Sequence, residues 1–337
     1  MSRLALLICV SIFYLISICK AQVTVNNPQV IMQYIQKSPI LYSLDVLKDS
    51  IPPPDRSNNI VKNKFRRIKD ASEYLIMEYD ELIMADELYL KSNKLFDEKK
   101  FSEAESEFKK LYEKYPDYTL ALTMQAKCLI NQNKTDEALD ILRKAISENY
   151  IDYEAHYLLA DLYKKIDLID AAVRFITTAH ILNRNDNTIQ SLMSEIYKVK
   201  GLNLQNWQFV PQIKYEHSRD EVKIYCKTQY EGYAWAEALW KFDNDYRITK
   251  NNLDKKYNLN QYQECLMYHS IALQALPWYA ATEEGKAFKH SLETRKFNEF
   301  IFYEIILPEF PEESLKFTED QMNKMVDYIM VIRAGQK

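Results

Sequence analysis

Glycine is nearly absent from this sequence of 337 residues: the only four are Gly201, Gly232, Gly285 and Gly335. Glycine supplies the positive-φ positions of tight hairpins and the close backbone approach of phosphate-binding loops. Neither G-x-G-x-x-G nor G-x-x-x-x-G-K-[ST] occurs, which excludes the common nucleotide-binding loops. A sheet rich in hairpins is also disfavoured. The composition therefore predicts a nearly all-helical protein.

Sequence motifs for catalysis and metal binding are missing as well. No H-E-x-x-H, G-x-S-x-G or paired C-x-x-C pattern occurs. The densest group of titratable residues is Glu216-His217 with Asp220-Glu221, whose spacing fits no standard metal site and is typical of a solvated loop. We therefore expect no metal, no cofactor and no enzymatic activity.

A long apolar run occurs only at the N-terminus. Arg3 precedes the apolar run Leu4–Ile18, and Cys19-Lys20-Ala21 forms a small-x-small cleavage pattern before Gln22. The run is shorter than the about 20 residues that a membrane span needs. Residues 1–21 therefore predict a secretory signal peptide and an exported protein, periplasmic or extracellular. If the signal is not cleaved, the protein is a membrane-anchored assembly factor instead.

The cysteine count and the net charge limit the possible disulfides and the possible classes of partner. Cys128, Cys226 and Cys265 remain after cleavage, and Cys226 and Cys265 either pair or stay buried thiols. The formal charge of −4 argues against nucleic acid as a partner. Residues 56–69 hold a basic cluster, which is either a solvated face or a contact for an acidic partner or membrane. Membrane contact is thus expected only through an uncleaved signal or this cluster.

The segments before residue 85 are expected to lead into a larger helical region. Prolines interrupt residues 22–69, where short helices are predicted at 28–37 and 41–49. Residues 70–84 have a rough apolar stripe at helical spacing, which predicts a helix that caps the larger helical region.

Small residues recur with a period of 34 from residue 85 onwards. Ala104, Ala138 and Ala172 are spaced by 34, and each is followed four residues later by a large apolar residue: Phe108, Leu142 or Ile176. Ser92, Ala126 and Ala160 repeat at the same spacing. Two helices per unit explain this pattern, because only a small side chain fits where two helix axes cross closely.

The spacing and phase of these residues resemble the tetratricopeptide repeat family. The units then span 85–118, 119–152 and 153–186, and 187–199 is a final helix. The tryptophan and glycine of the family pattern are missing: Leu88, Leu122 and His156 stand for the first, and Ser92, Ala126 and Ala160 for the second. The resemblance implies an all-α fold, a right-handed α-solenoid continued or capped by a divergent helical C-terminal region.

The resemblance also implies a scaffold that binds a protein or peptide partner in a concave groove lined by the first helix of each unit. The groove positions would be Tyr89, Asn93, Phe96, Thr123, Lys127, Ile130, Tyr157, Asp161 and Lys164. These are apolar and aromatic residues with single charges, a mixture that suits an amphipathic or extended peptide.

Residues 205–337 are aromatic-rich and outside the repeat. All four tryptophans lie there, and helices are predicted near 219–243, 259–276, 282–305 and 318–333. An aromatic cluster around Trp235 and Trp240, and the pair Cys265 and His269 on one helix face, leave an alternative open: a helical enzyme or carbohydrate-binding protein with its site in this region.

Overall fold

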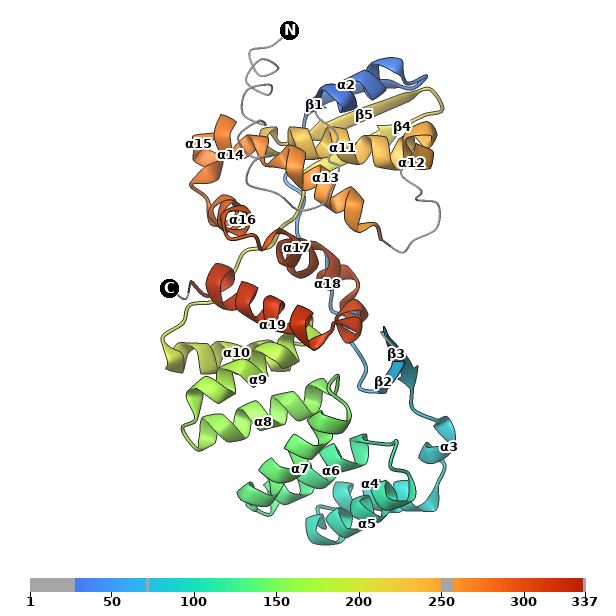
Figure 1. Ribbon diagram of the computed structural model, residues 1–337, viewed down its shortest axis with the longest axis vertical. Helices are drawn as coiled ribbons and strands as arrows, with labels where there is room; N and C mark the ends of the chain where they lie inside the picture. The colour runs from blue at the N-terminus through green and yellow to red at the C-terminus, as the bar shows by residue number, and fades with distance from the viewer. Residues whose placement is uncertain (1–27, 71–72, 250–256, 336–337) are drawn as a thin grey trace. The chain divides into compact units, whose positions relative to one another are not determined.

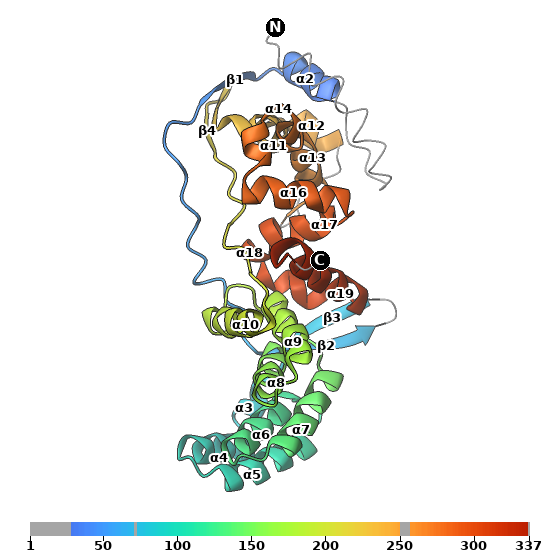
Figure 2. The ribbon, with the colours of Figure 1, turned by 90° about the vertical axis from the view of Figure 1, so that its left-hand side faces the viewer.

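The structure is a computed structural model that describes residues 28–70, 73–249 and 257–335. The predicted signal peptide and its cleavage site lie outside the described residues. Contacts divide the chain into two compact units that cut across the segments expected from the sequence. Unit 1 combines the described residues of 1–55 and 205–306, and unit 2 combines 56–204 with 307–335. Figures 1 and 2 show the elements of both units.

Unit 2 contains the predicted stack of helix pairs. The pairs are α4 (Glu87–Asp97) with α5 (Phe101–Lys114), α6 (Leu120–Asn131) with α7 (Thr135–Glu148), and α8 (Tyr153–Lys165) with α9 (Ile169–Leu182), followed by α10 (Asn187–Lys200). Ala104, Ala138 and Ala172 are fully buried where neighbouring helices meet. The expected helical solenoid is therefore confirmed, with the small residues at the close contacts that packing demands.

The turns within the pairs adopt a left-handed conformation without glycine. Lys99, Asn133 and Asp167 follow the first helices at intervals of 34 residues and have φ of 60°, 60° and 61°. The next N–H in each turn bonds five residues back, as from Lys100 to the Leu95 carbonyl at 2.9 Å. This is the Schellman arrangement, which closes a helix on a left-handed residue.

Replacing Lys99 with glycine is therefore expected to stabilise unit 2 by about 1 kcal/mol. A residue with a Cβ is strained at positive φ, and the asparagine and aspartate at the two equivalent turns tolerate it better than lysine. Chemical denaturation followed by far-ultraviolet circular dichroism measures the change, and Asn133→Gly is the matched control with a smaller gain. A loss of stability in Lys99→Gly would contradict the account.

The predicted capping helix over 70–84 is wrong. The chain instead forms a hairpin of β2 (Phe65–Asp70) and β3 (Glu73–Glu78), followed by the single turn α3 (Glu81–Met84). Tyr74 and Ile76 are half-buried while Leu75 and Met77 are exposed, a strand period of two. Apolar residues on both faces also fit a helix, so pairing with β2 decides the structure.

The end of the chain returns to the repeats. It comprises α18 (Leu307–Glu309), the 3₁₀ turn η3 (Pro311–Lys316), α19 (Glu319–Tyr328) and the π-helical turn η4 (Ile329–Arg333). α19 packs against α9, and η3 contacts both α9 and β3. The predicted helix near 318–333 is present and covers the side of the third pair.

Unit 1 is built around a small mixed sheet. Its strands are β1 (Leu41–Val46), β5 (Glu221–Cys226) and β4 (Ile213–His217), in that order, with β1 parallel and β4 antiparallel to β5. The helices are α2 (Pro28–Lys37), η1 (Thr228–Tyr230), α11 (Glu231–Phe242), α12 (Asn244–Thr249), α13 (Leu259–His269), α14 (Ile271–Ala275), α15 (Pro277–Ala280), α16 (Glu283–Glu293), α17 (Phe297–Phe300) and η2 (Ile301–Ile306). α11 packs on β5 through Ala234 and Ala238.

Two helix predictions in unit 1 need correction. The predicted helix at 41–49 is strand β1, and the first part of the predicted helix at 219–243 is strand β5. Val222, Ile224 and Cys226 are buried while Lys223 between them is exposed, so the strand period was present in the sequence. The predicted helix at 28–37 is confirmed as α2. In the part of the chain that the structure describes, no helix is long and apolar enough to cross a bilayer.

Candidate functional site

The predicted groove residues lie on the first helices of the repeats and are mostly half-buried. Thr123 is the exception and a correction, because it is fully buried and its hydroxyl donates to Asp152 Oδ2 at 2.6 Å. Thr123 lies in the interior between neighbouring repeats and cannot contact a partner. The remaining eight positions keep part of their side chains accessible.

Pairing within the repeats reduces the charge of these positions. Lys127 forms an ion pair with Glu154 of the next first helix, and Lys164 does so with Glu195 of α10. Asp161 pairs with Lys165 at 2.7 Å. Neighbouring first helices are thus tied together, and the accessible surface offers aromatic and apolar side chains beside neutralised charges.

Residues 56–70, which we call the strap, run extended along the loops that join the repeats. Asn183, fully buried at the end of α9, accepts from the Val61 N–H at 2.9 Å and donates to the Val61 carbonyl at 3.3 Å. Asn149, equally buried at the end of α7, accepts from the Arg67 N–H at 3.2 Å and donates to the Phe65 carbonyl at 3.0 Å. Each side-chain amide therefore pairs with strap backbone as a neighbouring strand would.

The two asparagines occupy the same place in consecutive repeats, 34 residues apart. This regularity was visible in the sequence, but nothing there indicated that the amides face a distant segment. Asn63 of the strap adds a bond to Asp152 Oδ1 at 2.9 Å, and Arg66 pairs with Asp117 at 2.8 Å. The strap is thus held at the third, second and first loops in turn.

Asp152 is the most deeply buried carboxyl of this region. It caps the start of α8 by accepting from the Glu154 and Ala155 N–H groups, both at 3.1 Å. Thr123 and Asn63 complete its hydrogen bonds. Burial raises the pKa of Asp152, and these donors partly offset the shift. The carboxyl joins two repeats and the strap, which makes it a structural group.

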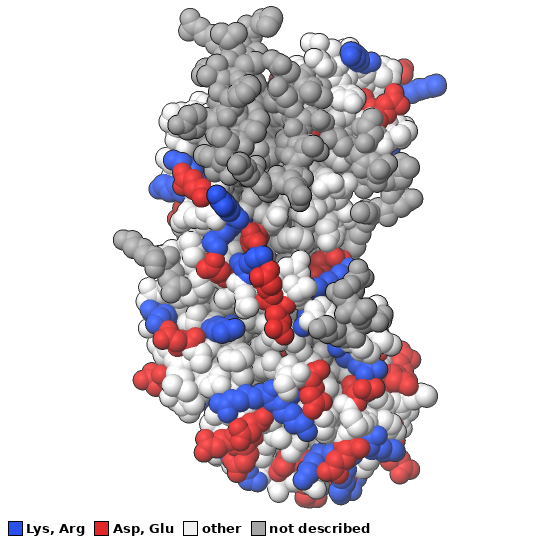
Figure 3. All heavy atoms as spheres, viewed as in Figure 1, with Lys and Arg blue, Asp and Glu red and all other residues white. Residues whose placement is uncertain are grey.

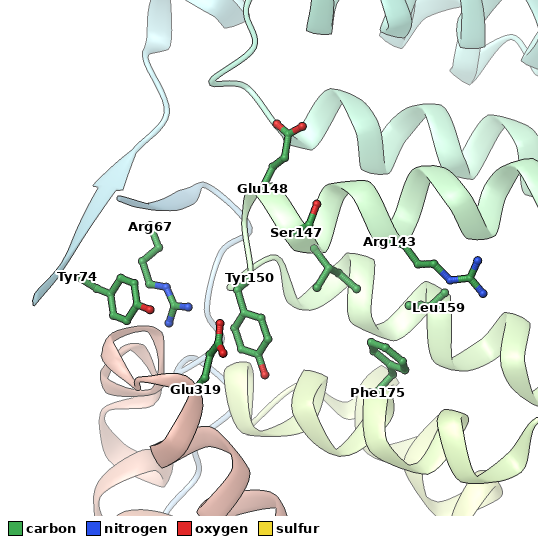
Figure 4. A pocket seen from close by; sticks show the side chains of 10 residues that line it. Arg67, Tyr74, Arg143, Ser147, Glu148, Tyr150, Leu159, Phe175 and Glu319 are labelled. Carbon is green, nitrogen blue, oxygen red and sulfur yellow. The ribbon is translucent and has the colours of Figure 1, made fainter. Parts of the chain in front are cut away.

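A pocket of about 510 Å³ opens between the β2–β3 hairpin, the C-terminal half of α7, the middle of α8 and α9, and the start of α19. Figure 4 shows Tyr150 in its middle, with Arg67, Tyr74 and Glu319 at one end. The Arg67 guanidinium lies 3.8 Å from the centre of the Tyr74 ring and 5.2 Å from that of Tyr150. Burial lowers the pKa of Arg67, which nevertheless remains a cation.

The other end of the pocket has an apolar floor and a polar rim. Leu159 is fully buried, and Phe175 packs 5.5 Å from the ring of Tyr163. Arg143 donates to the Tyr163 hydroxyl from Nε at 3.2 Å, and Glu148 accepts from Tyr112. Sequence reasoning missed this pocket, because its residues come from positions 67 to 319.

Comparison with known proteins identifies the repeats. A tetratricopeptide repeat family model matches residues 95–150 and 133–196. This part of the chain is a tetratricopeptide repeat array. No curated protein is similar enough to match. A crystal structure of a tetratricopeptide repeat protein from Parabacteroides merdae is similar at 15% identity and a TM-score of 0.31, over 72% of this chain and 98% of that one.

Outside the tetratricopeptide repeats, most candidate residues of unit 1 are interior, and Trp235 is half-buried against the core of the small sheet. Tyr230, Tyr233 and Trp240 are at most 3% exposed and form a core, not a ligand platform. Cys265 and His269 do share a helix, but burial raises the pKa of the thiol well above its ordinary value and lowers that of the imidazole to about 3. Burial therefore disfavours both a thiolate and an imidazolium at this pair.

The three cysteines after the predicted signal are free thiols, and all are buried. The possible bridge between Cys226 and Cys265 is therefore not formed. Across residues 28–70, 73–249 and 257–335, no group of three His, Cys, Asp or Glu side chains is placed to hold a metal ion. Glu216 and His217 lie on β4, and Glu216 accepts from Lys214.

A hydrogen-bonded chain of side chains crosses unit 1. His269 Nε2 lies 2.7 Å from the Tyr279 hydroxyl, which donates to Glu284 Oε1 at 2.9 Å. Tyr230 donates to the same oxygen at 2.9 Å. Burial raises the pKa of Glu284 to about 7, and the negative charge of Glu304 adds to the shift.

We expect this carboxyl to make unit 1 less stable as pH rises. The folded-state pKa of about 7 exceeds the ordinary 4.5, so the stabilisation is complete below about pH 4.5 and is lost as pH rises through 7. A shift of this size corresponds to about 3 kcal/mol. Glu284→Gln keeps an oxygen for both tyrosines and should remove the loss.

Denaturation of the wild type and Glu284→Gln at pH 5 and pH 8.5, followed by tryptophan fluorescence, measures this effect. All four tryptophans belong to unit 1, so the signal reports on that unit. Because His269 is present in both proteins, its own titration cancels in the difference. An equal difference between the two proteins at both pH values would contradict the assignment.

Proposed function

We propose that the protein is an exported scaffold that binds a protein or peptide partner in the groove lined by the first helices of its repeats. Tetratricopeptide repeats are protein-interaction scaffolds, and the groove positions other than Thr123 remain partly accessible. Their aromatic residues and paired charges suit an extended or amphipathic segment.

The observation that carries this proposal is the strap. Asn149 and Asn183 hold an extended segment through its backbone N–H and carbonyl groups, at matching places in two repeats. An array of this kind has a regular spacing that an extended chain can follow, since each repeat presents the same groups again. In our proposal the groove of the first helices binds a second extended segment on the same principle.

Surface charge supports a protein partner over a nucleic acid. On the face of unit 2 in Figure 3, basic and acidic side chains are interspersed. Nucleic acid binding draws on clustered Lys and Arg that neutralise phosphates. The alternative of an enzyme or carbohydrate-binding site in 205–337 is less well supported, because its candidate residues other than the half-buried Trp235 are interior.

Site-specific photo-crosslinking of the full chain in its native compartment tests the groove. A photoreactive residue at Tyr157, half-buried on α8, is expected to give one discrete partner adduct. Lys109, exposed on the second helix α5, is the matched control position and should give none. Adducts of equal yield from both positions would refute groove binding. The absence of an adduct from Tyr157 would also refute it, provided that a known complex is captured under the same conditions.

Export makes a separate prediction about the mature chain. Cleavage after Ala21 should give a protein that begins at Gln22 and carries a formal charge of −6, because Arg3 and Lys20 are removed from a chain of charge −4. Intact mass and N-terminal sequencing of the protein recovered outside the cytoplasm measure this. Recovery of the uncleaved chain in membranes would favour the anchored form.

A further inference from the structure

We propose that the pocket around Tyr150 receives one large apolar side chain from an uncharged stretch of peptide, whose backbone is held by Arg67 and Glu319. The inference rests on the proposed function in that the occupant is a peptide, but it places a contact outside the groove of the first helices. The volume of about 510 Å³ lies within the range of ligand sites and exceeds that of any single side chain.

The floor of the pocket is suited to an apolar side chain. Leu159, Ile146 and the rings of Tyr150 and Phe175 line it. Leu159 is fully buried, and Phe175 is fixed between His156 and Tyr163 at ring distances of 5.8 and 5.5 Å. A preformed apolar floor does not have to reorganise on binding, which favours a bulky aromatic or leucine side chain over a small one.

The other end of the pocket offers one donor group and one acceptor group. Within the described residues, the Arg67 guanidinium makes a single hydrogen bond, from Nη1 to the Phe317 carbonyl at 2.6 Å. Arg67 lines the pocket, and its guanidinium stacks on the ring of Tyr74. Glu319, at the start of α19, forms no hydrogen bond or ion pair with another described residue. Figure 4 shows its carboxylate beside Tyr150 and facing Arg67.

A donor beside an acceptor matches the N–H and carbonyl of a peptide backbone. Arg67 can donate to a backbone carbonyl while Glu319 accepts from a backbone N–H. Asn183 uses the same combination on Val61 of the strap. The pocket would therefore bind the backbone of a partner in the same way as the side-chain amides of the repeats bind the backbone of the strap.

The charges of the rim argue for an uncharged occupant. Arg67 and Arg143 are balanced by Glu148 and Glu319. An anion drawn to Arg67 meets Glu319 nearby, and a cation drawn to Glu319 meets Arg67, so neither gains a net attraction. A neutral backbone satisfies both groups, which distinguishes it from a chain terminus or a charged small molecule.

Saturation-transfer difference NMR on the full chain tests the proposal with N-acetyl-phenylalanine N-methylamide, the smallest neutral peptide with a large ring. We expect binding with a Kd of about 1 mM. The corresponding alanine compound should bind at least tenfold more weakly. N-acetyl-phenylalanine with its free carboxylate, and phenylalanine N-methylamide with its free ammonium, should bind no more tightly than the neutral compound. Tenfold tighter binding of either charged compound would overturn the assignment.

Two pairs of variants place the ligand. Ser147 lines the pocket, is exposed and donates only to Lys144 O within its own helix, so Ser147→Trp fills the space without opening the core. Binding should be lost in Ser147→Trp and kept in Ser147→Ala. Glu319→Ala should weaken binding about fivefold, whereas Glu319→Gln keeps an acceptor and should change it less than twofold. Unchanged binding in both Ser147→Trp and Glu319→Ala would overturn the inference.

The groove and the pocket can fail separately. If the Tyr157 crosslink persists in wild type while the phenylalanine compound does not bind, the groove proposal stands and the pocket inference falls. If the compound binds the wild type and does not bind Ser147→Trp, but Tyr157 gives no adduct, the pocket inference stands without the groove proposal.

Discussion

Replacing Gly285 with alanine is expected to destabilise unit 1 by about 4 kcal/mol. A Cβ at this position would lie 2.1 Å from the Tyr279 carbonyl oxygen and 2.9 Å from its carbon. Overpacking usually costs about 1–3 kcal/mol, because side chains move aside. Here the obstacle is backbone, held by the turn in which the Thr282 N–H bonds to the same oxygen at 2.9 Å. The helix α16 must therefore move as a whole.

The expected loss of stability in Gly285→Ala is opposite in sign to the effect of an ordinary glycine-to-alanine substitution in a helix. Alanine is favoured over glycine inside a helix by about 1 kcal/mol, so without the contact the variant would be more stable than the wild type. Gly232 offers a second instance, since its Cβ would lie 2.4 Å from the Tyr268 carbonyl oxygen where α11 crosses α13. Gly232→Ala should be destabilised in the same way.

Urea denaturation followed by tryptophan fluorescence measures both variants, because every tryptophan is in unit 1. Lys289→Ala, on the exposed face of α16, is the control and should change the free energy of unfolding by less than about 0.5 kcal/mol. A stabilised Gly285→Ala would mean that α16 does not approach the turn at 279–282 as closely as described.

The repeats could be predicted from the sequence because their packing is local and periodic. Ala104 contacts helices within one or two units of itself, so its small size recurs at a spacing of 34 whatever the rest of the chain does. The scarcity of glycine also predicted a mostly helical chain, although the left-handed turns at Lys99, Asn133 and Asp167 form without it.

The strands could not be predicted in the same way, because their partners are distant. Leu41 of β1 pairs with Glu221 of β5, and only that contact makes a short segment with polar residues extended. The candidate groove residues were predicted from helical spacing alone, which does not show whether a neighbouring repeat covers a position. A helical spacing places Thr123 on the first helix, but its hydrogen bond to Asp152, which caps the first helix of the following repeat, shows that it is interior. The pocket needs residues from β2 to α19, so it exists only in the folded chain.

Replacing Asn183 with alanine is expected to cost about 4 kcal/mol and to release the strap. The side-chain amide is the only hydrogen-bonding partner of the Val61 N–H and carbonyl among the described residues, and Val61 is 2% exposed. Each buried backbone group left without a partner costs about 1–3 kcal/mol. Asn149→Ala acts on the Phe65 carbonyl and Arg67 N–H in the same way. Both variants should fold their helices, since neither side chain lies inside one.

Limited proteolysis of the full chain detects this release at residues 56–70, where Lys62, Lys64, Arg66 and Arg67 offer trypsin sites. Cleavage there should be at least 100-fold faster in Asn183→Ala than in the wild type, because a cost of about 4 kcal/mol raises the open population by nearly 1,000-fold. Asn131→Ala is the matched control: its amide donates to Lys127 O on an exposed helix face, and its loss should leave cleavage unchanged. Equal protection of the strap in the wild type, Asn183→Ala and Asn131→Ala would show that side-chain amides do not hold it. The backbone-binding principle behind the proposed groove would then lose its support.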